Sequence, residues 1–131
     1  MTSKAHFADR SPYGWWIAAY IELAVWDDKA KSSPRSRCTA WENTIILKAR
    51  NREAAYKKAI RLGKAGATRF WNHDGKRKGR WSFLGLTKLL PIYEELEDGA
   101  EVLWVEHSGR SLAKISARVK KKRELEVFKR S

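Results

Sequence analysis

Clusters of basic side chains, rather than catalytic residues, are the most conspicuous chemical feature of this sequence. One cluster lies between Trp71 and Trp81 and comprises Lys76, Arg77, Lys78 and Arg80. A second lies near the C-terminus and comprises Arg118, Lys120, Lys121, Lys122 and Arg123. Lysine and arginine contact phosphates, and aromatic rings stack on bases. Both clusters are therefore candidate nucleic-acid-binding residues. The alternatives are a solvated loop beside core tryptophans and a solvated tail.

Metal-ligating residues are scattered in this sequence. The three histidines (His6, His73 and His107) and the single cysteine (Cys38) are far apart and share no ligand spacing. There is no Gly-x-Ser-x-Gly nucleophile motif and no phosphate-binding glycine loop. We therefore expect no metal site, no cofactor and no catalytic residue.

Glu42 and Glu101 are two carboxylates with a possible acid–base role. A pair of carboxylates can perform acid–base chemistry if their environments separate their pKa values. The alternative is that each pairs with a lysine or arginine across a sheet, as strand residues commonly do. We favour the structural role, and expect a protein that is not an enzyme.

The net charge of +13 is unevenly distributed. Residues 89–109 contain six acidic residues and no lysine or arginine, whereas residues 110–131 contain nine basic and two acidic residues. The basic excess predicts attraction to nucleic acid, to an anionic membrane surface or to an acidic protein. The acidic block has no use in a pure nucleic-acid binder, but a partner surface or a homodimer interface could use it.

The hydrophobic pattern predicts a strand, a second strand and a helix in the first half of the chain. Residues 15–26 are apolar on both alternating faces, which favours a central strand. Residues 45–47 form an apolar run typical of a strand covered on both faces. Asn51 is a plausible N-cap for a helix that ends at Gly63 or Gly66, with small and apolar residues on one face.

Three further strands and a helix are expected in the second half. Residues 68–72 and 80–86 are predicted strands joined by a hairpin at Asp74-Gly75. Residues 101–107 alternate as a fifth strand, and residues 111–128 show a helical apolar spacing. Residues 89–96 contain Pro91 and are expected to form a short helix or an irregular link.

These elements give the order β-β-α-β-β-β-α and an α+β fold class. We expect a mostly antiparallel five-stranded sheet with one helix packed on a face and a basic C-terminal helix. The expected organisation is a polar arm at 1–14, a single α+β domain at 15–107 and the basic helix at 108–131.

Several motifs resemble one small family. They are Trp16-Ile17-Ala18, Trp41-Glu42, Trp81-x-Phe83-Leu84-Gly85-Leu86 and Gly99-x-Glu101-Val102. Together, and in this order, they resemble the small bacterial family catalogued as domain of unknown function 4288, over about residues 15–106. The resemblance implies a compact, cytoplasmic, bacterial domain, and it implies no reaction.

The expected function is that of a non-enzymatic polyanion-binding module, with nucleic acid as the favoured partner, bound through the hairpin tip and the C-terminal helix. The alternative is a protein–protein interaction module, such as an antitoxin or immunity-type protein, with an acidic protein partner. The apolar run 15–25 is too short to span a bilayer and lacks a cleavage site, so we expect a cytoplasmic protein without a membrane span.

Overall fold

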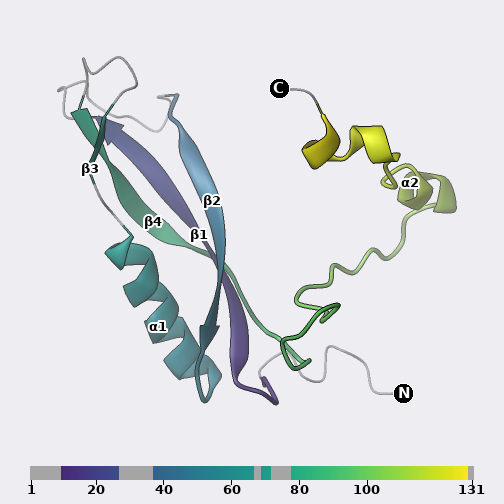
Figure 1. Ribbon diagram of the computed structural model, residues 1–131, viewed down its shortest axis with the longest axis horizontal. Helices are drawn as coiled ribbons and strands as arrows, with labels where there is room; N and C mark the ends of the chain where they lie inside the picture. Colours follow the sequence, from purple (N-terminus) through teal and green to yellow (C-terminus); the bar gives the residue numbers. More distant parts are fainter. Residues whose placement is uncertain (1–9, 27–36, 67–68, 72–77, 130–131) are drawn as a thin grey trace.

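The computed structural model describes residues 10–26, 37–66, 69–71 and 78–129. Four strands form one antiparallel sheet in the order β2-β1-β4-β3 (Figure 1). Their bounds are β1 Trp15–Trp26, β2 Ala40–Lys48, β3 Arg69–Trp71 and β4 Lys78–Pro91. The helices are α1 Arg52–Ala65 and the short α2 Leu112–Ser116, and two 3-10 turns follow at Lys122–Glu124 and Glu126–Phe128. The fold class is therefore α+β, as predicted.

Strand β1 is central, as its two apolar faces predicted. It pairs with β2 on one side and with β4 on the other. Its first half is the most buried part of the sheet, because Trp16, Ile17 and Ala18 are each at most 2% exposed. The prediction for residues 45–47 was only partly right: Leu47 is buried, but β2 is an edge strand and Ile46 is 49% exposed.

Helix α1 packs on one face of the sheet (Figure 1). The Asn51 side chain accepts a hydrogen bond from the Ala54 N–H at 2.8 Å, which confirms the predicted N-cap. The helix ends at Gly66, one of the two predicted glycines. Its small buried residues Ala55 and Ala59 let it lie close to Trp16, Ala18 and Leu47 of the sheet.

Two predicted elements were wrong, and a third was only partly right, since β4 continues to Pro91 within the residues 89–96 that were expected to form a short helix or an irregular link. Residues 101–107 form no strand, so the part of the chain that the structure describes has four strands in its sheet rather than the expected five. A strand needs a hydrogen-bonding neighbour, and the chain leaves the sheet after Pro91 without returning to it (Figure 1). The long helix at 111–128 is also absent, and only α2 and the two 3-10 turns form there. A helix without a surface to pack on is marginal at this length, and four successive cations at 120–123 oppose it further.

Candidate functional site

The second basic cluster lies in a segment built from single turns. Ser111 caps α2 by accepting a hydrogen bond from the Lys114 N–H at 3.2 Å. The chain then turns again at Lys122–Glu124, where the Glu124 carboxylate accepts a hydrogen bond from the Lys121 N–H at 3.0 Å. Every residue from 108 to 129 is exposed, so this segment presents its side chains to solvent.

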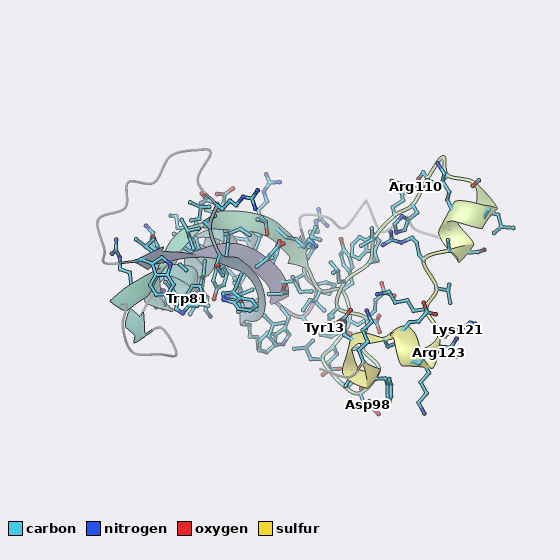
Figure 2. All side chains as sticks on the ribbon, turned by 90° about the horizontal axis from the view of Figure 1, so that it is seen from above. Tyr13, Trp81, Asp98, Arg110, Lys121 and Arg123 are labelled. Carbon is cyan, nitrogen blue, oxygen red and sulfur yellow. The ribbon has the colours of Figure 1, made fainter. Side chains whose placement is uncertain are left out.

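Three of the predicted basic residues converge there. Lys121, Lys122 and Arg123 line an open cleft of about 480 Å³ together with Phe128. The Lys122 ammonium lies over the Phe128 ring, 5.1 Å from its centroid, within the range of a cation–π contact. We call these four residues the basic cleft. Lys121 and Arg123 project from this end of the molecule in Figure 2.

The electrostatics of the basic cleft are strongly positive. Its two nearest acidic neighbours in sequence are already engaged: Glu124 accepts from a backbone N–H, and Glu126 pairs with Lys129 at 3.2 Å. Among the described residues, no carboxylate forms an ion pair with the cleft's three cations. Arg118 and Lys120 are exposed immediately before the cleft and extend the positive surface. An anion can therefore approach without displacing a protein carboxylate.

The first basic cluster is described only in part. Lys76 and Arg77 lie outside the described residues, as does the side chain of Lys78, whose backbone begins β4. Arg80 is described and exposed, and it pairs in register with Val25 of β1 and with Arg69 of β3. The predicted hairpin turn at Asp74-Gly75 also falls outside the described residues.

An aromatic pair lies near the same end of the sheet. The rings of Trp41 and Trp81 are 6.3 Å apart in an edge-to-face arrangement. The register places Glu22 opposite Trp41, and the Glu22 carboxylate accepts a hydrogen bond from the Asn43 side chain at 2.7 Å. Trp41 is 57% exposed, although Trp81 is partly buried. Exposed tryptophan area is a stacking surface for a base or another ring.

The described part of the first cluster and the basic cleft do not form one continuous site. Trp81 and the pair Lys121 and Arg123 lie at opposite ends of the molecule in Figure 2. Sequence reasoning missed two residues, Phe128 in the basic cleft and Trp41 beside Trp81. The signal for Phe128 was available, since an aromatic residue follows the basic run by only a few positions.

The model of the family "Domain of unknown function (DUF4288)" matches residues 15–104. The chain belongs to this family. The matched region contains the whole sheet, helix α1 and the Trp41–Trp81 pair, whereas the basic cleft lies beyond it. The family resemblance seen in the sequence motifs is thereby confirmed. No curated protein and no solved structure matches the chain at a significant level.

Glu42 and Glu101, the two carboxylates in the family-like motifs, have different surroundings in this chain. Glu42 lies on β2 and accepts a hydrogen bond from the Thr87 hydroxyl at 2.5 Å, and among the described residues it forms no ion pair with a lysine or arginine. The Glu101 backbone N–H donates to the Glu94 carboxylate at 3.2 Å. Within the described part of the chain, no three His, Cys, Asp or Glu side chains gather as a metal site would require. Nor does any helix there have the length and apolar character needed to cross a membrane.

Proposed function

We propose that this protein is a non-enzymatic polyanion-binding module whose favoured partner is nucleic acid. The observation that carries the proposal is the basic cleft, where Lys121, Lys122 and Arg123 line one opening together with Phe128 and the Lys122 ammonium lies over its ring. The cations would take phosphates, and the ring, 52% exposed, would stack on a base. Arg118 and Lys120 would extend the phosphate contacts along the strand.

The far end of the sheet offers a second contact region in this proposal. Arg80 would contact a phosphate there, near the Trp41–Trp81 pair, and the proposal gives the same role to Lys76, Arg77 and Lys78, whose side chains lie outside the described residues. The two regions lie far apart (Figure 2), so a short oligonucleotide would occupy one of them and a longer one could reach both. The proposal also places the protein in the bacterial cytoplasm, consistent with a single, exposed cysteine that has no internal disulfide partner.

A second candidate function is the binding of an acidic protein, as an antitoxin or immunity-type protein would do. The observation that favours it is apolar exposure among the same basic residues. Leu112, Val119 and Val127 are each at least 78% exposed. A phosphate backbone gains little from such side chains, whereas a protein surface can bury them.

Fluorescence anisotropy with labelled single- and double-stranded oligonucleotides of unrelated sequence tests the proposal. We expect binding with little sequence preference, because phosphate contacts carry no base information. The triple variant K121A/K122A/R123A should weaken binding strongly. The matched control R37A/R50A/R61A removes the same charge from three exposed residues elsewhere and should weaken it less.

Two results would count against nucleic-acid binding through the basic cleft. If both triple variants weaken binding equally, only net charge matters and the cleft has no special role. If wild-type protein shows no binding at about 50 mM salt, where electrostatic binding is strong, the acidic-protein partner becomes the better hypothesis.

A further inference from the structure

Strand β4 has an open outer edge. Along its length it pairs with β1 on one side, but β3 pairs only with Lys78, Gly79 and Arg80 on the other. Among the described residues, no strand covers the outer edge from Ser82 to Pro91. Two register shifts against β1 leave Leu84 and Thr87 as bulged residues of β4. The rest of this edge presents unpaired N–H and C=O groups and is a template for another strand.

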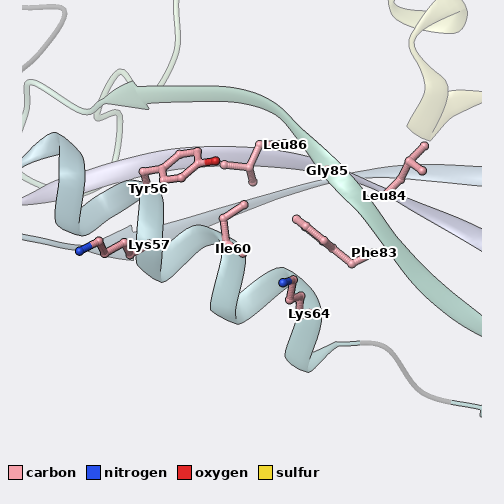
Figure 3. A pocket seen from close by; sticks show the side chains of 8 residues that line it. All are labelled: Tyr56, Lys57, Ile60, Lys64, Phe83, Leu84, Gly85 and Leu86. Atoms are coloured by element: carbon pink, nitrogen blue, oxygen red, sulfur yellow. The ribbon is translucent and has the colours of Figure 1, made fainter.

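A groove with apolar walls lies beside this open edge. It has a volume of about 700 Å³ and lies between α1 and β4, lined by Tyr56, Lys57, Ile60, Lys64, Phe83, Leu84, Gly85 and Leu86. Figure 3 shows Phe83 and Leu86 turned toward the helix and Leu84 turned away from it. Lys57 and Lys64 on the helix make the surroundings of the groove positive.

The chain contains a segment whose residue pattern is that of a strand and which could pair with the open edge of β4. Residues 101–107 alternate as a strand would and carry Glu101 and Glu106 near their ends. They form no strand here, and Val102, Leu103 and Val105 are 42%, 37% and 63% exposed. Seven residues fit within the ten-residue edge. In a strand Glu101 lies on the same face as Leu103 and Val105, where its charge suits the lysines of α1, and Glu106 lies on the opposite face.

Contacts around residues 93–101 hold this segment away from its own β4. The Glu94 carboxylate accepts a hydrogen bond from the Glu101 N–H, the Glu97 carbonyl accepts one from the Ala100 N–H, and the Tyr93 ring lies 5.1 Å from that of Trp104. Gly99 adopts a positive φ of 87° in this turn. The chain therefore continues away from the sheet, as Figure 1 shows.

We infer that two copies of this chain form a dimer by exchanging residues 101–107, each segment adding as a fifth strand to the open β4 edge of the other copy. Main-chain hydrogen bonds would supply the pairing, and one alternating set of side chains would enter the groove beside Tyr56, Ile60 and Leu86. The exchange buries Leu103 and Val105, which share one face of the strand, and closes the open edge in one step. This inference is independent of the proposed function.

Light scattering coupled to size-exclusion chromatography tests it on the full chain. We expect about twice the monomer mass of 15.2 kDa. The variants L103P and V105K should return the mass to that of a monomer while keeping the thermal transition of the sheet, because both residues lie outside its core. The matched control V119K changes an equally apolar, more exposed residue outside the segment and should leave the dimer intact.

Hydrogen exchange distinguishes exchange between copies from closure within one copy. In the dimer, the amides of residues 102–105 should be protected, and their protection should fall on dilution. A wild-type monomer at concentrations up to about 0.1 mM would overturn the inference, whether these amides are protected or not. A dimer that survives both L103P and V105K would overturn it equally.

Discussion

At Gly63, helix α1 approaches β4 so closely that a methyl group on the Cα would lie 2.3 Å from Cε1 of Phe83. Alanine is the better helix former by about 1 kcal/mol, yet it cannot fit here unless the Phe83 ring moves. The residue therefore sets the distance between the helix and the sheet.

Replacing Gly63 by Ala should lower the free energy of unfolding by about 1–2 kcal/mol, because overpacking outweighs the gain in helix propensity. Urea unfolding with an unchanged m-value is the measurement. Gly85→Ala is the matched control, since nothing lies within 4 Å of its added Cβ. A stabilised G63A protein would show that the helix does not contact Phe83 this closely.

The tryptophans divide into core and surface positions. Trp16 is 2% exposed and its indole N–H donates to the Ala49 carbonyl at 3.0 Å, whereas Trp41 is 57% exposed. Trp16→Ala should therefore cost about 3–5 kcal/mol of stability, and Trp41→Ala less than about 1 kcal/mol. Chemical denaturation of both variants compares them directly, and equal losses would contradict the assignment of Trp41 to the surface.

At the scale of elements, Asn51 lies in the short link between β2 and α1 and caps the helix. Its side chain satisfies one of the free N–H groups in the first turn of the helix. Asn51→Ala should cost about 1 kcal/mol, measured by thermal or urea unfolding. The neighbouring exposed Arg50→Ala serves as the control and should change stability by less than about 0.5 kcal/mol. A neutral N51A variant would show that the cap contributes nothing to the helix.

The C-terminal segment should be dispensable for folding. No residue from 108 to 129 is buried, and the core residues of the sheet all lie before residue 93. Truncation after His107 should leave a cooperative thermal transition, followed by circular dichroism. Loss of that transition would mean that the segment docks on the sheet, contrary to the arrangement in Figure 1.

Elements with local signals were the ones that sequence reasoning placed correctly. Residues adjacent in the sequence are enough to predict three features: the Asn51 cap, the Gly66 end of α1 and the two-faced apolar pattern of β1. Residues 101–107 and 111–128 carry equally clear patterns, but a strand needs a hydrogen-bonding neighbour and a short helix needs a surface to pack on. The hydrophobic pattern of a segment does not show whether the rest of the fold supplies that neighbouring strand or that packing surface. The sequence spacing marks Phe128 as a candidate residue, but its contact with Lys122 depends on two successive 3-10 turns, which that spacing does not predict.

At the scale of the whole molecule, the packed core and the basic cleft lie in different parts of the chain. The family region supplies a packed sheet and helix, and the basic cleft is displayed beyond it on exposed turns. The proposed strand exchange would bring two such clefts into one assembly. Two linked sites raise the effective affinity for any polyanion long enough to reach both.

The salt dependence of oligonucleotide binding tests the central claim most directly. If the basic cleft contacts phosphates, the affinity should fall with salt with a log–log slope of about −0.7 to −0.9 for each phosphate neutralised. The variant K121A/K122A/R123A should then reduce the magnitude of this slope by about two to three, as anisotropy titrations at several salt concentrations will measure. An unchanged slope in the variant, or no binding by wild-type protein at about 50 mM salt, would contradict the claim.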